Sequence, residues 1–365
     1  MTTTVRKDVF SKAIGTTVKA VGANPIIPLL SNILFESNNG NSRVAGTNLE
    51  IGISYTFPST GEPFKTCVPA KTIAALIEAL HTDEIDLEID PDNQSLIVMT
   101  ESSTSNIHCA PADEFPDILQ VDNPSFSLPV EQFKQSVQRV AFCSSANADS
   151  AISGVQLSVE DGKLIMFAVD GYHLSYEEST LLEEGDTSLF PIVVKGTTLE
   201  MISRTLPDEG ELQVQAGKNK AMFHCEEVDV ITQLMQGEFP DHNKLKESIA
   251  APTTILTVST LQLLRAARQL RVFASETGGS KLSAKGMLVR CSAIARDRGD
   301  ADVTFAAIKK GSDIELGINI HLLYELLEIC TTEYVTVETA DNRSPILFRM
   351  QGVETFYHVI MPIVL

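Results

Sequence analysis

Apolar residues recur at the spacing of a buried helix face in three separate stretches of the chain. The stretches are Val68–Leu80, Val194–Leu206 and Ile318–Cys330, each 13 residues long. In the first, Ile73, Ile77 and Leu80 follow one another at intervals of four and three residues, which places them on one side of a helix. The stretches begin 126 and 124 positions apart, and such a period indicates a repeated structural unit.

A second helical pattern precedes the first one in every repeat. These earlier stretches are Val5–Gly22, Leu128–Phe142 and Val258–Phe273. Each later helix is followed by alternating apolar and polar residues, as in "EIDLEID", "ELQVQAG" and "YVTVETA". The pattern therefore predicts an α+β fold of three similar domains, each with two helices packed on antiparallel sheets. We place the domains at residues 1–123, 124–249 and 250–365.

The tetrapeptide Glu-Phe-Pro-Asp occurs twice, starting at Glu114 and at Glu238, 124 positions apart. It closes the first and second repeats, whereas the third repeat ends in "FYHVIMPIVL" at the chain terminus. We interpret it as an exit turn that is anchored by a buried phenylalanine.

Composition and charge narrow the class of protein. The chain has 365 residues, 43% of them hydrophobic, and a formal net charge of −20, which disfavours a protein that grips nucleic acid tightly through clustered Lys and Arg. The first residues lack the apolar region of a secretory signal, and no apolar run has membrane-spanning length. Six cysteines are scattered without a CxxC pair, which is typical of reduced thiols. We therefore expect a cytoplasmic protein with no membrane association.

Positive charge is concentrated on the three earlier helices. Their basic residues are Arg6, Lys7, Lys12, Lys19, Lys134, Arg139, Arg265, Arg268 and Arg271. Only Asp8 and Glu131 oppose them, so these windows sum to +7 within a strongly acidic chain. Because equivalent helices of all three repeats share the bias, we interpret them as facing DNA on one surface around an axis.

Three domains are too few to surround a DNA duplex. Neighbouring helix axes lie about 10 Å apart, so twelve helices from six domains close a ring about 38 Å across. Removing a helix thickness of about 10 Å leaves a bore of roughly 28 Å, which admits a hydrated duplex. Two chains of three domains related by symmetry supply the six.

Catalysis is the main alternative function. Asp170 and His173 could form an acid–base pair, and Cys143 stands beside Ser144. The sequence has no nucleophile elbow, no GxxxxGK[ST] loop and no HExxH helix, however, so we predict no catalytic residue.

Two further alternatives concern metal binding and a different kind of binding protein. The pairs His108–Cys109 and His224–Cys225 are too sparse within each repeat to act as metal ligands, and both stand in strand-like sequence, so we predict no metal site and no cofactor. A non-catalytic peptide-binding scaffold that does not encircle DNA would keep the three repeats. Such a scaffold would need no basic helices.

Several longer motifs resemble one known family in their order and spacing. They are "NPIIPLLSNILF", "SGVQLSVEDGKLIMFAVDGYHL", "GEFPDHNKL", "LGINIHLLYELL" and the terminal "VIMPIVL". Together they resemble the bacterial DNA polymerase III beta subunit family, the sliding clamps, over nearly the whole chain.

The resemblance implies a head-to-tail homodimeric ring of six domains that encircles double-stranded DNA without sequence specificity. Such a ring acts as a replication processivity factor, because it tethers DNA polymerase and other proteins that carry a clamp-binding motif. It is closed on DNA by a clamp loader and has no active site of its own. The joint would bring the first domain of one chain to the third domain of the other, with Ile107 and Leu270 as apolar members.

The family also carries a hydrophobic peptide-binding cleft between its second and third domains. The matching positions are Ile152, Val169, Gly171, His173, Leu174, Pro240, Lys244, Leu245, Asn319, Leu322, Ile346, Val359, Ile360, Met361, Pro362 and Ile363. The sequence departs from the family at Asp149, His173 and Val364, where arginine is usual, and at Asn24, where a basic residue is frequent. These departures affect the expected partner peptide and the strength of DNA contact.

Overall fold

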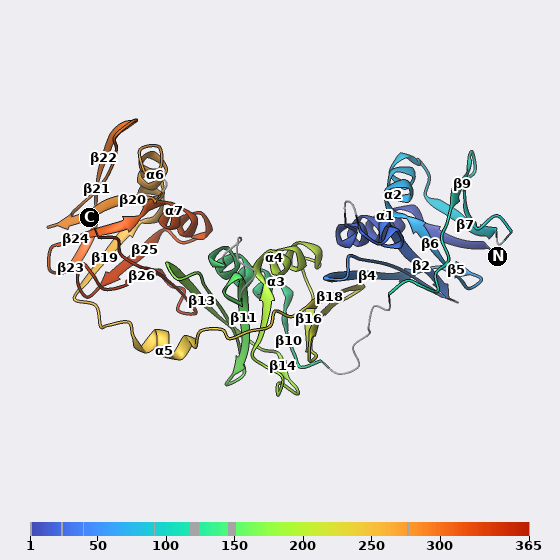
Figure 1. Cartoon of the computed structure of the whole chain (residues 1–365), viewed down its shortest axis with the longest axis horizontal. Helices are drawn as coiled ribbons and strands as arrows, with labels where there is room; N and C mark the ends of the chain where they lie inside the picture. Colours follow the sequence, from blue (N-terminus) through green and yellow to red (C-terminus); the bar gives the residue numbers. More distant parts are fainter. Residues whose placement is uncertain are drawn as a thin grey trace. The chain divides into compact units, whose positions relative to one another are not determined.

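The computed structural model describes most of the chain (Figure 1). The described residues are 2–22, 25–38, 40–90, 92–116, 124–144, 151–275 and 277–364. They form two compact units: the first comprises Met1–Glu131, Leu181–Leu189 and Met201–Leu234, and the second comprises Gln132–Thr180, Phe190–Glu200 and Met235–Leu365. Asn24 and Asp149, two of the departures from the family, lie outside the described residues.

The first compact unit contains two antiparallel sheets. The five-stranded sheet has the order β5 (Thr60–Gly61), β1 (Thr2–Arg6), β7 (Glu84–Asp90), β8 (Ser95–Met99) and β9 (Thr104–His108). The nine-stranded sheet has the order β14 (Glu183–Glu184), β10 (Phe126–Pro129), β16 (Glu211–Ala216), β17 (Lys220–Cys225), β18 (Val228–Gln233), β4 (Ile51–Pro58), β3 (Asn41–Thr47), β2 (Asn32–Asn38) and β6 (Phe64–Pro69).

The second compact unit also contains two antiparallel sheets. Its nine-stranded sheet has the order β15 (Ile192–Lys195), β11 (Gly154–Glu160), β12 (Lys163–Val169), β13 (His173–Thr180), β27 (Phe356–Ile360), β26 (Ile346–Met350), β25 (Tyr334–Thr339), β19 (Thr254–Ser259) and β23 (Ile308–Gly311). Its four-stranded sheet has the order β22 (Gly299–Ala306), β21 (Leu288–Ala295), β20 (Gly279–Lys285) and β24 (Ile314–Asn319).

Two long helices belong to each domain, and each begins at the residue after a strand. They are α1 (Lys7–Thr17), α2 (Ala70–Ala79), α3 (Val130–Val140), α4 (Gly196–Thr205), α6 (Thr260–Leu270) and α7 (Ile320–Ile329). Short 3-10 turns are η1 (Val18–Ala20), η2 (Pro28–Ser31), η3 (Ala141–Cys143) and η4 (Ala151–Ser153). All six predicted helices are confirmed, and each predicted window begins inside the strand that leads into its helix.

The strands repeat the threefold pattern of the sequence. Each domain contributes a group of five strands, namely β5-β1-β7-β8-β9, β14-β10-β16-β17-β18 and β23-β19-β25-β26-β27. Each also contributes a group of four, namely β6-β2-β3-β4, β15-β11-β12-β13 and β24-β20-β21-β22. Each nine-stranded sheet combines a group of five from one domain with a group of four from the neighbouring domain. The two groups are joined through their last strands, which are β18 and β4 in one sheet and β27 and β13 in the other. The predicted three-domain α+β fold is therefore confirmed.

Aromatic side chains form the core beneath the first helix. Phe10 of α1 lies 5.4 Å from Phe35 of β2 and 5.7 Å from Phe57 of β4, measured between ring centroids, and all three rings are buried. Helix α1 also packs against α2. In the exit turn of the first domain, Phe115 is 7% exposed and joins a small cluster with Leu34 and other residues, as the sequence predicts.

Candidate functional site

The second and third domains share one continuous sheet within the second compact unit. Strands β13 and β27 pair antiparallel, with Leu174 opposite Val359 and His173 opposite Ile360. The ladder extends past the end of β27, because the backbone N–H of Met361 donates to the carbonyl oxygen of Tyr172 at 2.8 Å. This pairing brings together residues of two domains, although the residues are more than 180 positions apart in the sequence.

A tight turn positions the start of β13. The Asp170 carboxylate accepts hydrogen bonds from the backbone N–H groups of Tyr172 at 2.8 Å and His173 at 3.0 Å. Gly171 adopts φ +93°, a conformation that favours glycine, and a side chain there would meet open space. Although burial opposes ionisation, hydrogen bonds from His173 and from the turn hold the pKa of Asp170 below its usual range.

The terminal segment leaves the sheet at Pro362, which has no N–H to continue the ladder. Met361 is 45% exposed and Val364 is 94% exposed, while Ile363 is half-buried and its N–H donates to the carbonyl oxygen of Gly317 at 2.9 Å. The flexible apolar side chain of Met361 is therefore at the surface, while backbone hydrogen bonds of Met361 and Ile363 fix the chain on both sides of Pro362.

An apolar cluster covers the face of the shared sheet that lies opposite the third-domain core. It is built on Ile165, Phe167, Tyr176, Leu347, Tyr357 and Val359, with Val169, Leu174, Phe239, Leu245 and Ile249 packed against it and partly accessible. Phe239 meets Phe167 edge-on at 5.8 Å between centroids, so the second exit turn packs on the sheet through its phenylalanine, which is only partly buried rather than buried as predicted. Four predicted cleft residues, Val169, Leu174, Leu245 and Val359, thus meet in one place.

A short helix that the sequence analysis did not predict completes this wall. Helix α5 (His242–Glu247) begins after Asp241, whose carboxylate accepts from the N–H groups of Asn243 at 2.9 Å and Lys244 at 3.4 Å. The N-cap aspartate was the available signal, but six residues carry too little periodicity to identify a helix. Leu245 of this helix points into the apolar cluster, and Lys244 stays exposed at its rim.

The other predicted cleft residues differ in how accessible they are. Those that remain at least partly exposed are Ile152, Gly171, Pro240, Asn319, Leu322, Pro362 and Ile363, together with Met361 and Lys244. Ile346 and Ile360 are 0% exposed and belong to the core of the third domain, on the face of the sheet opposite Val359. The expectation that these two form an accessible apolar wall is wrong, because alternate residues of a strand point to opposite faces.

His173 is also inaccessible, since it is 5% exposed. Its ring meets the ring of His358 edge-on at 5.2 Å between centroids, and the ring of Phe142 stacks on His358 at 5.3 Å. Burial, aided by the nearby His173, lowers the pKa of His358 well below its usual range, and burial raises the pKa of the Cys143 thiol. Nε2 of His173 lies 3.3 Å from the carboxylate of Asp170, so this pair is a contact between a buried ring and a partly exposed carboxylate.

The predicted DNA-facing residues are mostly at the surface. Arg6, Lys12, Lys19, Arg265, Arg268 and Arg271 are exposed, and Lys7 and Lys134 are partly exposed. The guanidinium group of Arg271 lies 3.9 Å above the ring of Tyr324 on the neighbouring helix α7. These positions agree with basic helix faces on α1 and α6.

Arg139 is the exception, and its prediction as a DNA-facing residue is wrong. It is 5% exposed and its Nη1 donates to Oε1 of Glu177 at 2.9 Å; Glu177 is 3% exposed. Thr355 donates to the same oxygen at 2.9 Å. Burial raises the pKa of Glu177, and Arg139 opposes this shift. A cation held in this way links α3 to the shared sheet and is unavailable to a phosphate.

The two residues predicted for the dimer joint lie inside their own domains. Leu270 is 0% exposed in the core of the third domain, so it offers no apolar surface to a partner, and its prediction as an interface residue is wrong. Ile107 is 5% exposed but belongs to β9, the last strand of its sheet. The pairs His108–Cys109 and His224–Cys225 lie in or directly after strands, as expected.

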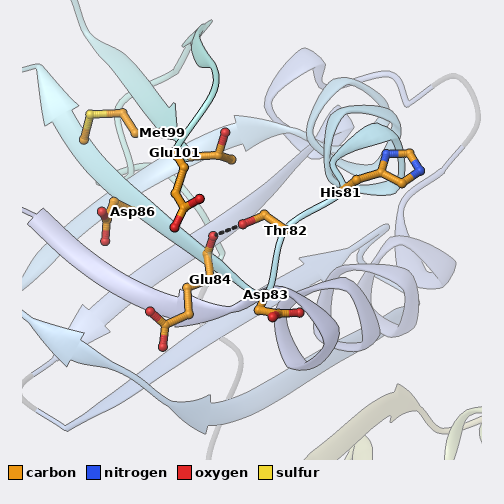
Figure 2. A pocket seen from close by; sticks show the side chains of 8 residues that line it. His81, Thr82, Asp83, Glu84, Asp86, Met99 and Glu101 are labelled. Atoms are coloured by element: carbon orange, nitrogen blue, oxygen red, sulfur yellow. Dashed lines mark hydrogen bonds between the residues drawn. The ribbon is translucent and has the colours of Figure 1, made fainter.

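An open hollow of about 810 Å³ lies on the first domain between the end of α2 and the β8–β9 turn (Figure 2). Its lining includes the carboxylates of Asp83, Glu84, Asp86 and Glu101, and Thr82 Oγ1 donates to the carbonyl oxygen of Glu84 at 2.9 Å. No predicted site residue lines this hollow. Its acidic character is unsuited to binding a phosphate backbone.

Models of one protein family match all three domains in order. The DNA polymerase III beta subunit N-terminal, central and C-terminal domains match residues 1–119, 127–241 and 250–364. The chain belongs to the DNA polymerase III beta subunit family. It is 24% identical to the beta sliding clamp of Pseudomonas putida over 98% of each chain, and 26% identical to that of Chlamydia pneumoniae over 94% of this chain and 93% of the relative.

The fold of this beta subunit family member agrees with solved structures. The crystal structure of the DNA polymerase sliding clamp from Bacillus subtilis superposes with a TM-score of 0.93 at 20% identity, covering 100% of this chain and 99% of that one. Family membership makes the chain an accessory protein of DNA replication. Within the described part of the chain, no helix has the length and apolar character needed to cross a membrane.

Proposed function

We propose that two copies of this chain close into a ring that encircles duplex DNA, slides along it and tethers DNA polymerase. The observation that carries the proposal is the repeated sheet joint. In both nine-stranded sheets, a group of five strands joins a group of four through the last strand of each. One group of five, ending in β9, and one group of four, ending in β22, have no such partner among the described residues.

Pairing β9 of one copy with β22 of another would complete a third sheet of the same kind. The side of β22 that faces the core of the third domain carries Ala301, Val303 and Phe305. Ala301 and Val303 are only partly buried there. Ile107 occupies the inner face of β9. The exposed edge of a strand can form backbone hydrogen bonds with another strand. Because β9 and β22 belong to opposite ends of the chain, the joint is head-to-tail, and two chains of three domains close a ring of six domains.

The basic faces of α1 and α6 would then line the bore. Their contacts with phosphates are screened by salt and not specific for sequence, which suits a ring that must move along DNA. Retention is topological, so the acidic charge of the rest of the chain does not prevent it. In this proposal the chain is non-catalytic, and a clamp loader opens the ring to place it on DNA in the cytoplasm.

The cleft on the shared sheet would receive a short segment of the polymerase or of another partner with a clamp-binding motif. The accessible parts of the apolar cluster, Leu174 and Leu245, form its floor and wall, and Met361 can adjust its side chain to different occupants. Lys244 at the rim offers a positive charge. Val359 is a buried member of the same cluster. We infer that Ile346 and Ile360, on the opposite face of the sheet, support this surface from beneath.

The test measures the oligomeric state of the chain and its retention on circular and linear DNA. The parent chain is expected to sediment as a dimer at micromolar concentration and, once loaded, to stay on circular duplex DNA but run off linear DNA. Val303→Asp places a charge on the inner face of edge strand β22 and should yield a folded monomer that is not retained. Leu288→Asp, on the outer face of the adjacent strand at 57% exposure, is the control and should remain dimeric. A dimeric Val303→Asp chain would refute the joint, and equal retention on linear and circular DNA would refute encirclement.

A further inference from the structure

Three metal-ligating side chains converge inside the second compact unit. Cys143 ends the turn η3, His173 begins β13 and His358 lies in β27. They are 0%, 5% and 0% exposed, and one ligand atom of each lies within 4.8 Å of those of the other two. The second domain supplies two of the three side chains and the third domain supplies one, so only the folded joint between the domains brings them together.

Each of the two imidazole rings turns one nitrogen toward the other ring. Nδ1 of His173 and Nε2 of His358 lie 3.4 Å apart, at hydrogen-bond distance, so an ion bound between them would replace this contact. The outer nitrogen of each ring has its own partner: Nε2 of His173 lies 3.3 Å from the carboxylate of Asp170, and Nδ1 of His358 lies 2.6 Å from Oγ of Ser175. A histidine that donates its outer N–H to such a group presents the lone pair of its inner nitrogen to a metal.

The spacing of the inner nitrogens fits tetrahedral coordination. Zinc binds imidazole nitrogen at about 2.0–2.1 Å, so two nitrogens on one tetrahedral ion lie about 3.4 Å apart. A thiolate at about 2.3 Å would lie about 3.6 Å from each nitrogen, and the sulfur of Cys143 lies within 4.8 Å of one nitrogen of each ring. The ring of Phe142 stacks on His358, and the low exposure of all three side chains keeps bulk water away.

We propose that Cys143, His173 and His358 form a binding site for a divalent zinc-class ion, with Asp170 and Ser175 as the outer partners that orient the two rings. One sulfur and two imidazole nitrogens favour zinc over magnesium or calcium, which prefer oxygen ligands. A water molecule would have to supply the fourth ligand of a tetrahedral ion. The sequence analysis predicted no metal site, because the three ligands are far apart in the chain and follow no spacing motif.

The position of the site gives it a structural consequence. A bound ion would link η3 and β13 of the second domain to β27 of the third, and β27 leads directly into the terminal segment at Met361. Ion binding should therefore raise the thermal stability of the second compact unit. Metal content and spectra report on the ion itself, so the test does not depend on the clamp function proposed above.

The test uses the full chain, freed of metal with a chelator under reducing conditions and then titrated with cobalt or zinc chloride. The parent should bind one Co²⁺ per chain, with the charge-transfer absorption of a cobalt–thiolate bond and the visible bands of a tetrahedral ion, and Zn²⁺ should displace it. Cys143→Ser should lose the charge-transfer band, whereas Cys291→Ser, another buried cysteine of the same compact unit, should keep it. Ser175→Ala should bind the ion 10- to 100-fold more weakly, as loss of an outer partner typically does.

X-ray absorption at the zinc edge gives a result that needs no variant. One sulfur and two imidazole ligands around the ion in the parent chain would support the site, even if Cys143→Ser fails to fold. A shell of oxygen and nitrogen alone would overturn the proposal. So would a parent chain that takes up no stoichiometric Zn²⁺ or Co²⁺, or a folded Cys143→Ser chain that keeps the charge-transfer band. In those cases the three side chains are an ordinary buried polar contact.

Discussion

Replacing Arg139 with alanine should destabilise the protein strongly without acting through DNA. The substitution removes the cation from an ion pair in which both partners are at least 95% buried and the Nη1 to Oε1 distance is 2.9 Å. Glu177 would keep only the hydroxyl donor of Thr355 on Oε1, and its Oε2 has no hydrogen-bond partner among the described residues. The variant therefore contains a buried carboxylate without a counter-charge.

Breaking one side of a buried ion pair typically costs about 3–5 kcal/mol, because the remaining charge stays desolvated. The guanidinium group of Arg139 also lies 6.0 Å from the centre of the Phe356 ring, and alanine removes that contact as well. In a unit of about 190 residues, 1 kcal/mol changes Tm by about 2–4 °C, so the second compact unit should melt on the order of 10 °C lower.

The loss of unfolding free energy caused by Arg139→Ala should depend on pH in a defined direction. Burial already raises the pKa of Glu177, and Arg139 is the main group that opposes the rise. A carboxyl whose folded pKa lies above its unfolded value contributes stability below the unfolded pKa and loses it as the pH rises through the folded pKa. The difference in unfolding free energy between Arg139→Ala and the parent should therefore shrink as the pH falls from neutral toward the ordinary pKa of glutamate.

Differential scanning calorimetry suits this measurement, because the chain has no tryptophan for a fluorescence assay. Arg268→Ala, an exposed arginine of α6, is the matched control and should change stability by less than about 0.5 kcal/mol. The double variant Arg139→Met with Glu177→Leu should recover most of the loss, since it removes both charges together. An Arg139→Ala chain as stable as Arg268→Ala, or one that folds normally but is no longer retained on DNA, would refute the assignment of Arg139 to the interior.

Three further outcomes follow from the surfaces described. Exchanging Lys12, Arg265 and Arg268 for glutamate should weaken retention on circular DNA at low salt while leaving the melting temperature nearly unchanged; parental retention would show that these helices do not face DNA. Deleting Ile363–Leu365 should abolish binding of a polymerase tail peptide in a titration and leave the dimer intact, whereas unchanged affinity would place the peptide site elsewhere. Phe115→Ala should cost about 3–5 kcal/mol in chemical unfolding with peptide affinity preserved, and a loss below about 1 kcal/mol would contradict its buried anchoring role.

The repeat, the six long helices and the family could all be inferred from the amino-acid sequence alone. Amphipathic periodicity is a local property, so three equivalent pairs of helices could be found from residue spacing alone, and the structure confirms each pair. The exit-turn phenylalanines could be identified for the same reason, since the tetrapeptide recurs at the period of the domains. Short elements escaped this reasoning, because α5 is too brief to show a helical period.

The candidate cleft was predictable as a region but not residue by residue. Matching positions located the terminal segment and the turn at Gly171, yet the sequence did not reveal which side of β27 each residue faces. The register of β13 against β27 sends Val359 outward and Ile360 into the core. Because side chains alternate along a strand, a single pairing decides accessibility for all of them.

Features that depend on contacts between residues far apart in the chain became evident from the folded structure. In the sequence Arg139 is one more basic residue on a basic helix, whereas in the fold it pairs in the interior with Glu177, 38 positions away. Cys143, His173 and His358 share no sequence motif and meet only because β13 and β27 pair across two domains. The packed chain as a whole determines which strand edges pair and which charges are buried. Helical periodicity, in contrast, depends on residues that are close together in the sequence.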